Sequence, residues 1–403
     1  MSNFICKTCR YTGSVLLYDF GQMPAVNNFI DKKNVSKELK YPMELHVCKK
    51  CWLIQLSSVP DRSSLFDYYH HVSGASVGNV SHLEEVSQFI LQLMPNKGKV
   101  LEVGCNDGTL LNFLNKKGFN VIGVDPAKNI KQPNNIKIHQ DYYGTSFGVK
   151  YSKYYGSFNL VVGLNVFAHN VSFLDMLIAS RELMDDNGLL LLEVAYALDT
   201  ICDGNFDTIY HEHVCSYSLT ALNHAFEKAG LKGIDVHQIP TQGGSIRVIA
   251  SKKESEKIVS ASYEKILNME RKLGISKPNY YENLFQNIRN KIENIQNFLK
   301  KVNEENKKLL IIGAPARGVV IMNVCNINFN QKPIIIDDTK EKQGKLMPGV
   351  HFPIFDWNDI SFYDYDVAFI LSWNYASHLY EKLKKFNFKG DVYVPLPELK
   401  KIN

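Results

Sequence analysis

VLEVGCNDGTLL (residues 100–111) is the stretch from which the fold of this chain is best read. An apolar, β-branched run leads into Gly104-x-x-x-Gly108, and apolar residues at helical spacing follow the second glycine. Glycine lets a backbone approach a ligand closely, and a helix N-terminus helps to hold a negative group. The stretch therefore predicts a strand, a glycine-rich ligand-binding turn and a helix.

The sequence on the C-terminal side of this stretch alternates between candidate strands and helices. Four more runs are typical of strands: NVIGVD (120–125), IKIHQD (136–141), FNLVVGLN (158–165) and GLLLLEVAY (188–196). Their spacing leaves room for helical crossovers, which predicts a parallel, doubly wound α/β sheet. GIDVHQI (233–239) and SIRVIAS (245–251) are expected to complete the sheet as an antiparallel hairpin.

A second, shorter α/β unit is predicted after a long helix. Apolar residues recur at spacings of three and four along that helix: Phe285, Ile288, Ile292, Ile295, Leu299 and Val302. We expect this stripe to pack against its own chain, with a dimeric coiled coil as the alternative. The strand pattern then returns in KKLLIIGAPARG (307–318), PIIIDD (333–338), YDVAFIL (365–371) and DVYVPLP (391–397).

The acids around the glycine-rich turn indicate which ligand it holds. Glu102 and Asp107 flank the turn, and the negative charges of two acids would repel a pyrophosphate. They suit the positively charged amino and sulfonium groups of S-adenosylmethionine. Asn106 replaces the middle glycine of a dinucleotide fingerprint, which weakens a dehydrogenase interpretation. The predicted donor-binding residues are Glu102, Gly104, Asn106, Asp107, Gly108, Asp125 (toward the ribose hydroxyls), Pro126, Asp141 (toward the adenine) and Asn165.

Four of the eight cysteines form two identical pairs near the N-terminus, Cys6-x-x-Cys9 and Cys48-x-x-Cys51. Lysines beside both pairs favour the thiolate form, and two such turns can present four thiolates to one tetrahedral Zn²⁺. A redox pair or inert core residues are the alternatives. We predict a structural zinc site made of Cys6, Cys9, Cys48 and Cys51. Cys105, Cys202, Cys215 and Cys325 are expected to be packing residues.

A second cluster of reactive side chains lies in FDTIYHEHVCSYS (206–218). Tyr210, His211, Glu212 and His213 place four acid–base groups in four positions, and histidine can take a proton at neutral pH. The spacing of the two histidines is not the HExxH spacing of a zinc hydrolase. Upstream, His169 follows the fourth predicted strand and is expected at the same end of the sheet as the donor.

These segments resemble the family of sugar C-methyltransferases that act on nucleotide-linked 4-keto-6-deoxyhexoses in deoxysugar pathways. The resemblance covers essentially the whole chain. Besides the double CxxC, the segments that carry it are MPAVNNF (23–29), YPMELHVCKKCWLIQL (41–56), EVGCNDGTLL (102–111), GVDPA (123–127), NVFAH (165–169), FDTIYHEH (206–213), TQGGSIRV (241–248), GAPARG (313–318), DDTKEKQGKLMPG (337–349) and LSWN (371–374). Trp52 stands where the family usually has a glycine.

The resemblance implies three domains: a zinc-binding domain (1–70), a class I, Rossmann-like methyltransferase domain (71–252), and a helical linker with a second Rossmann-like α/β domain (253–403). It implies that His213 is the general base, with Tyr210, Glu212 and His169 in support and Tyr68 or Tyr69 reaching the site. The family usually shows Tyr-x-Tyr there, whereas this chain has Tyr69-His70-His71. The implied substrate-binding residues are Tyr68, Gly243, Gly244, Ser245, Arg247, Gly313, Ala314 and Arg317.

The implied reaction is methylation of C3 or C5, because a 4-keto group acidifies both positions. The implied substrate is a dTDP-, GDP- or CDP-linked sugar, and the chain is expected to be a monomer or homodimer. The sequence leaves the sugar, the nucleotide and the choice of carbon open. Three alternatives compete with this interpretation: an NAD-dependent nucleotide-sugar oxidoreductase, since IIGAPARG also resembles a Rossmann first turn; a non-catalytic zinc-ribbon binding protein with a degenerate methyltransferase fold; and an O- or N-methyltransferase.

Composition sets the outer limits of these interpretations. The 403 residues are 45% hydrophobic and 22% charged, which is typical of a globular protein with a sizeable core. The formal charge of +5 is mild for this length, so it does not indicate nucleic acid as a partner. No apolar run approaches the roughly 20 residues that span a bilayer. We therefore expect a cytoplasmic protein with no membrane partner.

Overall fold

The computed structural model describes residues 4–403 except 68, 70, 71 and 203. The described chain forms two compact units, and each is treated by itself below. The first unit comprises residues 1–16, 46–199 and 212–280, and the second comprises residues 17–45, 200–211 and 281–403. These units do not follow the three successive blocks that the sequence predicts, so the three-domain division stays a prediction.

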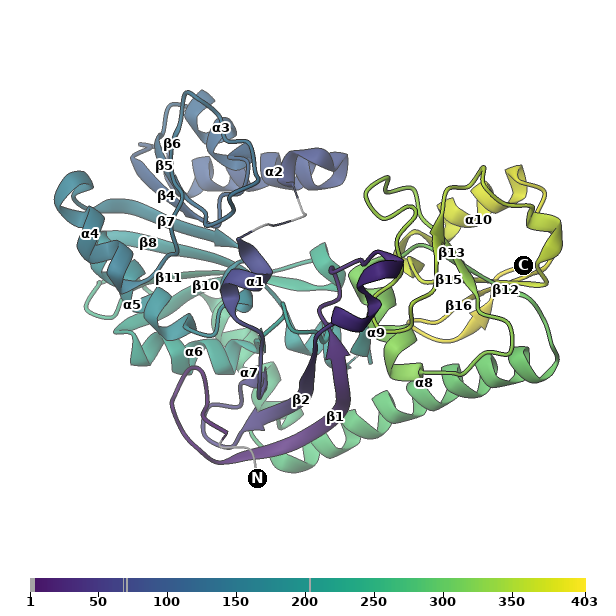
Figure 1. The fold of residues 1–403 in the computed structure, drawn as a ribbon. Coiled ribbons are helices and arrows are strands. Elements are labelled where there is room, and N and C mark those ends of the chain that lie inside the picture. Colours follow the sequence, from purple (N-terminus) through teal and green to yellow (C-terminus); the bar gives the residue numbers. More distant parts are fainter. Residues whose placement is uncertain (1–3, 68, 70–71, 203) are drawn as a thin grey trace. The chain divides into compact units, whose positions relative to one another are not determined.

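The first unit is built on a seven-stranded sheet with the order β10-β11-β8-β7-β4-β5-β6 (Figure 1). Its strands are β4 (Lys99–Val103), β5 (Asn120–Val124), β6 (Lys137–His139), β7 (Phe158–Leu164), β8 (Met184–Ala195), β10 (Leu231–Ile239) and β11 (Ser245–Lys252). The five strands from β8 to β6 are parallel, and β10 and β11 form an antiparallel hairpin beside β8. The predicted doubly wound sheet and its terminal hairpin are thus confirmed.

Helices cover both faces of this sheet (Figure 1). Helices α2 (Val77–Leu93) and α3 (Thr109–Lys116) pack on one face, where Leu83, Ile90 and Leu111 meet buried residues of β4, β7 and β8. The other face carries α4 (Thr145–Tyr155), α5 (Phe173–Leu183), α6 (Leu219–Lys228) and α7 (Ala261–Leu273). Burial of these apolar side chains at about 25 cal/mol per Å² provides most of the driving force for the layered arrangement.

A smaller sheet has the order β1-β2-β3-β9. Its strands are β1 (Ser14–Pro24), β2 (Lys40–Cys48), β3 (Ile54–Leu56) and β9 (Cys215–Ser216). The first three strands lie in the N-terminal region that contains the two CxxC pairs. The fourth, β9, comes directly after the YHEH segment, so a strand from the middle of the chain completes the N-terminal sheet. Helix α1 (Arg62–Phe66) follows β3, and its N-cap Asp61 accepts a hydrogen bond from Ser63 N.

The second unit contains a six-stranded sheet with the order β14-β13-β12-β15-β16-β17. Its strands are β12 (Leu309–Ile312), β13 (Ile334–Ile336), β14 (Ile354–Phe355), β15 (Val367–Ile370), β16 (Asp391–Val394) and β17 (Lys400–Lys401), of which β17 alone among these six is antiparallel to its neighbour. Helix α10 (Ala376–Lys385) packs on one face through Leu379 and Leu383. Phe298 of α8 (Pro278–Glu304) packs against Phe369 and Tyr393, and α9 (Ala316–Cys325) runs beside α8.

Two expectations about packing can be compared with these units. All six residues of the predicted stripe on α8 are buried within the chain, as expected for a helix that packs on its own protein. Cys105, Cys215 and Cys325 are buried free cysteines, which confirms their interpretation as packing residues. Across the described part of the chain, none of the helices has both the length and the apolar character that crossing a bilayer requires.

Candidate functional site

The glycine-rich turn after β4 has a backbone that a bulkier residue would not fit. Gly104 has a φ of +67°, and a Cβ placed there would meet Val166 Cγ2 at 2.5 Å. Gly108 has a φ of +74° and is the N-cap of α3. Asn106 also lies in the left-handed region, with a φ of +52°. Glycine at 104 is therefore required both by the positive φ and by the close approach of Val166.

The segment before α2 lies against this turn. Ser73 N donates to Asn106 Oδ1 over 2.9 Å, and Gly74 N donates to Asp107 Oδ2 over 2.8 Å. Both residues belong to the 3₁₀ helix η2 (Ser73–Ala75). Asp107 Oδ1 also accepts from Thr109 N at 3.1 Å, which satisfies a free N–H group at the start of α3. Asn106 and Asp107 thus fix the shape of the turn with their side chains.

Carboxylates gather at the ends of β4 and β5. Glu102 is 5% exposed, and its Oε2 has no hydrogen-bond partner among the described residues. Burial raises the pKa of Glu102 well above its usual range, and the charges of Asp125 and Asp107 raise it further. Burial also raises the pKa of Asp125, although its oxygens accept 2.9 Å hydrogen bonds from Ala127 N and Asn106 N. A buried acid with one unpartnered oxygen beside two other acids fits a cationic ligand.

The remaining residues predicted to bind the methyl donor differ in the contacts they make with the protein. Asp141 follows β6 and is ion-paired with Lys150 Nζ at 2.9 Å. Asn165 follows β7 with a φ of +56°, and its N–H donates to Glu193 O over 2.8 Å. Pro126 follows Asp125 and is half-buried. Strands β4 and β7 are neighbours from which the chain leaves in opposite directions along the sheet, and ligands of doubly wound sheets bind at such a switch point.

The segment that carries Tyr69 is held at the ends of β5 and β6. Tyr69 N donates to Asn129 Oδ1 and Asn129 Nδ2 donates to Tyr69 O, both over 2.8 Å. Two residues earlier, Asp67 accepts from Lys128 Nζ at 2.6 Å and from Tyr142 Oη at 2.5 Å. Tyr68, the alternative to Tyr69, lies outside the described residues.

Two of the predicted catalytic histidines meet directly. The rings of His169 and His213 are 5.0 Å apart between centroids, in a T-shaped arrangement with an angle of 75°. His169 belongs to η3 (Phe167–His169), directly after β7, and the ring of Phe66 lies 6.1 Å from it. Phe66 in turn lies 6.0 Å from Tyr69. His169, His213, Phe66 and Tyr69 thus form one aromatic cluster in the first unit.

The pKa of Tyr69 depends on burial and on the acids near this cluster. Burial raises the pKa of Tyr69, and the charges of Glu212 and then Asp125 raise it further. Glu212 itself is 6% exposed. Tyr69 is therefore within electrostatic reach of both a residue of the YHEH segment and a predicted donor residue. Its hydroxyl stays protonated at neutral pH and can donate a hydrogen bond.

The first two residues of YHEH belong to the second unit. Tyr210 is 8% exposed there, and His211 is 1% exposed. His211 Nε2 is 3.2 Å from Pro42 O, and burial lowers the pKa of His211, so the ring stays neutral and donates to that carbonyl. No separate role for His211 followed from the sequence, and the structure assigns it to the anchoring of this segment on β2.

The predicted substrate residues of TQGGSIRV lie on η6 (Thr241–Gly243) and β11. Gly243 and Gly244 have φ values of +88° and +113°, and a Cβ on Gly244 would meet Asp199 Cβ at 2.3 Å. Ser245 is fully buried, and its Oγ donates to Thr241 O at 2.9 Å. The two glycines are therefore required by the turn itself.

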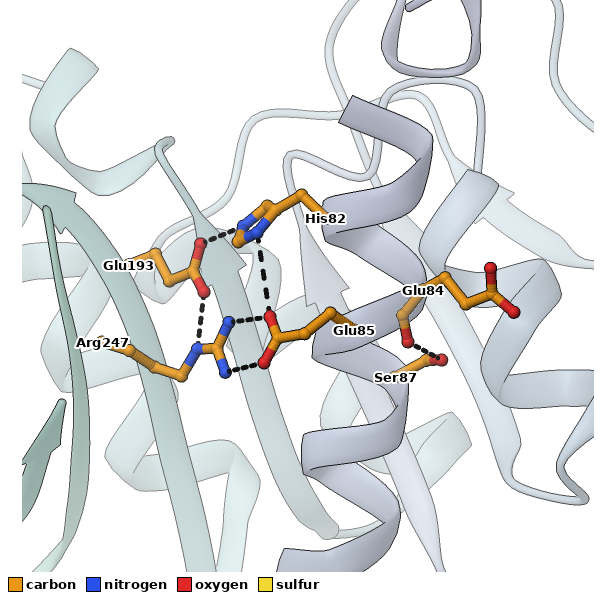
Figure 2. Close-up of polar contacts among 6 residues, drawn as sticks. All are labelled: His82, Glu84, Glu85, Ser87, Glu193 and Arg247. Carbon is orange, nitrogen blue, oxygen red and sulfur yellow. Dashed lines mark hydrogen bonds and ion pairs between the residues drawn. The ribbon is translucent and has the colours of Figure 1, made fainter. Parts of the chain in front are cut away.

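Arg247 is engaged by the protein on all sides (Figure 2). Its Nε donates to Glu193 Oε1 at 2.6 Å, and its two Nη atoms donate to Glu85 at 3.0 and 2.7 Å. His82 Nε2 meets the other oxygen of Glu193 at 2.7 Å. Arg247 is 2% exposed and its guanidinium lies over the ring of Phe89. We therefore leave Arg247 out of the substrate site proposed below.

Gly313, Ala314 and Arg317 lie at the carboxyl end of β12 in the second unit. Gly313 has a φ of +85°, and Ala314 N donates to Asp337 Oδ2 at 2.7 Å. Arg317 donates to both oxygens of Asp207 at 2.9 and 2.8 Å and lies over the ring of Trp373. Trp373 Nε1 donates to Asp207 as well, at 2.8 Å. Sequence reasoning assigned no role to Asp207 or Trp373, although both lie in quoted motifs, FDTIYHEH and LSWN.

The four predicted zinc ligands converge in the first unit. The Sγ atoms of Cys6, Cys9, Cys48 and Cys51 all lie within 4.8 Å of one another. Hydrogen bonds from Cys48 and Cys51 lower the pKa of Cys6, whereas Cys48, Cys6 and burial raise the pKa of Cys51. Four thiols this close cannot all ionise unless a cation lies among them. The donor set and the spacing fit a tetrahedral zinc ion.

Comparisons with known families divide the chain into three matched regions. A model for a zinc binding domain matches residues 6–66, a methyltransferase domain matches residues 80–236, and a C-methyltransferase C-terminal domain matches residues 240–397. The methyltransferase match and the strand order of the first unit confirm the predicted class I methyltransferase fold.

One named relative and several solved structures are similar to this chain. C-methyltransferase NovU of Streptomyces niveus is 28% identical over 400 residues, which cover 98% of this chain and 95% of that protein. Among solved structures, magnesium protoporphyrin IX methyltransferase from Synechocystis with bound S-adenosylmethionine is 16% identical with a TM-score of 0.33, covering 44% of this chain and 80% of that chain. A 1,6-didemethyltoxoflavin-N1-methyltransferase from Burkholderia thailandensis is 14% identical with a TM-score of 0.34, covering 45% of this chain and 83% of that chain.

Proposed function

We propose that this chain, which matches a C-methyltransferase C-terminal domain, a zinc binding domain and a C-methyltransferase relative, methylates C3 or C5 of a nucleotide-linked 4-keto-6-deoxy sugar. The methyl donor in this proposal is S-adenosylmethionine, which supplies an electrophilic methyl group on a positively charged sulfur. The observation that carries the proposal is the aromatic cluster of Tyr69, Phe66, His169 and His213. Burial raises the pKa of Tyr69, and the charges of Glu212 on the acceptor side and Asp125 on the donor side raise it further.

The donor would be held by the acids at the ends of β4 and β5. The unpartnered Oε2 of Glu102 and the neighbouring Asp107 suit the amino and sulfonium groups. Asp125 keeps lone pairs for the ribose hydroxyls beyond the two backbone bonds that it accepts. Asp141 can turn to an adenine amino group by giving up its half-exposed ion pair with Lys150, which costs little.

His213 would act as the general base. Carbon is a poor nucleophile unless a neighbouring carbonyl acidifies its C–H bond, so a base must remove that proton as the methyl group is accepted. The half-buried imidazole of His213 can take the proton, and its edge-to-face contact with His169 fixes the direction of the ring. Tyr69, Tyr210 and His169 are candidates to donate a hydrogen bond to the enolate oxygen.

The nucleotide part of the substrate would be recognised in the second unit. Gly313 and Trp373 follow β12 and β15, the neighbouring strands at the switch point of the C-terminal sheet, where doubly wound sheets bind ligands. Arg317 uses Nε and Nη2 for Asp207, which leaves Nη1 for a phosphate oxygen. Gly243, Gly244 and Ser245 stay candidates for contact with the sugar.

The proposal is tested with His213→Asn in the zinc-loaded protein. We expect the variant to bind S-adenosylmethionine normally in calorimetry and to lose roughly 10²- to 10⁴-fold in turnover with a 4-keto nucleotide-sugar. In heavy water the wild type should exchange the hydrogen beside the keto group, and the variant should not. The matched control is His378→Asn, which changes an exposed histidine on α10.

Three outcomes would redirect the proposal. Near-normal turnover of His213→Asn would move the base to Tyr210 or His169. Methylation of a hydroxyl or amine, with no 4-keto sugar accepted, would end the assignment to carbon. Binding of NAD without binding of S-adenosylmethionine would favour the oxidoreductase that the turn IIGAPARG first suggested.

A further inference from the structure

The side chain of Gln55 connects the four-cysteine cluster (Cys6, Cys9, Cys48 and Cys51) to the middle of the chain. Gln55 lies on β3 and is fully buried. Its Nε2 donates to Cys6 Sγ over 3.3 Å, and its Oε1 accepts from Lys7 N over 2.9 Å. Both ends of the amide are therefore committed to the first CxxC turn. A residue that only filled space here would not need a donor and an acceptor so placed.

The backbone of the same strand holds the segment after His213. Gln55 pairs with Cys215 and Ile54 pairs with Ser216 in the antiparallel β3–β9 ladder. Leu56 N donates to Val214 O over 3.0 Å, and Val214 is the residue next to His213. Val214 and Cys215 are 1% and 3% exposed, so this stretch cannot shift without disturbing the packed interior.

A second link runs in parallel to the first. Lys7 Nζ donates to Leu56 O over 2.5 Å, on the same residue whose N–H holds Val214. Cys6 and Lys7 are consecutive, so the first CxxC turn contacts β3 both through the amide of Gln55 and through the backbone of Leu56. Beyond β9 and Val214, the next contact is the ring pair of His213 and His169.

We infer that Gln55 is a positioning residue, through which the metal-loaded four-cysteine cluster holds His213 against His169. The inference rests on the function proposed above for His213. A thiolate bound to a metal is a strong hydrogen-bond acceptor, so the bond from Gln55 is charge-assisted and directional. Groups that hydrogen-bond metal ligands fix the orientation of those ligands, and Gln55 also pairs with Cys215 in the strand after His213. The four-cysteine cluster then contributes to catalysis without touching the substrate.

The test compares Gln55→Met with wild type in the full-length, zinc-loaded protein. Methionine keeps the length of the side chain and fills irregular space, but it offers neither the donor nor the acceptor. We expect one bound zinc, a dissociation constant for S-adenosylmethionine within about 2-fold of wild type, and zinc transfer to a colorimetric chelator about 10- to 100-fold faster. We expect kcat to fall about 10-fold while KM for the nucleotide-sugar changes little.

Two further variants keep the result interpretable if Gln55→Met folds poorly. Lys7→Met removes the second link and should give a smaller loss of kcat with the same unchanged KM. Thr8→Val, in the same turn, replaces a buried hydroxyl that has no partner among the described residues, so it should leave zinc release and kcat at wild-type values.

One readout needs no substrate. The imidazole proton signals of His213, assigned with His213→Asn, should move in Gln55→Met and stay in place in Thr8→Val. Unchanged signals together with unchanged kcat would overturn the inference, as would a loss of kcat that only follows the loss of zinc. If wild type methylates no keto-sugar, the proposed function fails, while the histidine signals still decide whether Gln55 positions His213.

Discussion

Among single residues, several with unusual backbone conformations lie next to the two predicted ligand sites. Asn106 and Asn165 adopt left-handed backbone conformations beside the donor turn, and Arg10 and Trp52 do so directly after the two CxxC pairs. Such conformations cost an ordinary residue about 1–2 kcal/mol. The φ of +60° at Trp52 is one that glycine adopts without strain, which fits the glycine of the family that the sequence resembles. The buried Oε2 of Glu102 also costs free energy, because it has no hydrogen-bond partner among the described residues.

Glu102 makes the stability of the donor-free protein depend on pH. Its pKa in the folded protein lies above the value of about 4.3 expected for the unfolded chain. Stability from this carboxyl group is therefore complete below the unfolded pKa and is lost as pH rises through the folded pKa. We expect the Tm of wild type to fall over this range relative to Glu102→Gln, which cannot ionise. Scanning calorimetry of the donor-free, zinc-loaded protein measures the difference.

The same measurement has a control variant and a result that would contradict the prediction. Asp141→Asn alters a half-buried acid that is already paired with Lys150, so its pH dependence should follow wild type. S-adenosylmethionine should raise the Tm of wild type more than that of Glu102→Gln at neutral pH, because the cation restores a partner to the carboxylate. Parallel pH profiles of wild type and Glu102→Gln would show that burial does not raise the pKa of Glu102.

Among the helices and strands, α2 is fastened to the sheet by charge as well as by apolar packing (Figure 2). His82 and Glu85 on α2 meet Glu193 on β8 and Arg247 on β11. Glu193 is fully buried and Arg247 nearly so. The Arg247 guanidinium holds the pKa of Glu85 below its usual range. The 3₁₀ helix η2 directly precedes α2, and its Ser73 and Gly74 donate hydrogen bonds to the glycine-rich turn after β4. By holding α2 on the sheet, this network therefore also holds η2 against that turn.

Removing Arg247 should therefore cost stability. Arg247→Met leaves the buried carboxylate of Glu193 without its main partner, and breaking a buried pair from one side typically costs about 3–5 kcal/mol. Glu85→Gln is the matched control, because Glu85 is 57% exposed in its side chain and an exposed partner contributes about 0–1 kcal/mol. Thermal unfolding measures both. An unchanged Tm with a raised KM for nucleotide-sugar would instead return Arg247 to the substrate site.

Over the molecule as a whole, the chain passes between its two compact units five times, at 16/17, 45/46, 199/200, 211/212 and 280/281. One passage falls inside the YHEH segment, between His211 and Glu212. The N-terminal strands β1 and β2 are also divided, since each runs from one unit into the other. The N-terminal region with the two CxxC pairs and the YHEH segment thus each contribute residues to both units.

Loss of zinc is therefore expected to lower the stability of more of the protein than the two CxxC turns. We predict about one equivalent of zinc in the purified protein, and Cys51→Ser should lose it, with a lower Tm and more aggregation. Cys325→Ala is the matched control, because it removes a buried thiol outside the cluster and should keep the metal. Elemental analysis and calorimetry give the two readouts. Metal-free wild type with an unaltered Tm would contradict a structural role for the four-cysteine cluster.

The features that could be predicted from the sequence are those that depend on neighbours along the chain. The apolar periodicity of residues 99–251 predicted the strands and the hairpin, because alternation and run length are local properties. The glycines at 104 and 108 predicted the turn between β4 and α3 for the same reason. The two CxxC pairs predicted the cysteine cluster, since four thiolates at that spacing have few other uses. The expected position of His169, where it meets His213, followed from the shared edge of parallel strands.

Which distant side chains meet could be learned only from the folded chain. Arg247 looked like a substrate residue in its motif, but the antiparallel register that sets it opposite Glu193 commits it to a buried ion pair. Asp207 accepts hydrogen bonds from Arg317, which lies 110 residues away in the sequence. Gln55 donates to Cys6 and pairs with the strand after His213. Such partners depend on strand register and on how the chain returns to an earlier element. No local pattern encodes them, because their energy arises only when packing removes both groups from water.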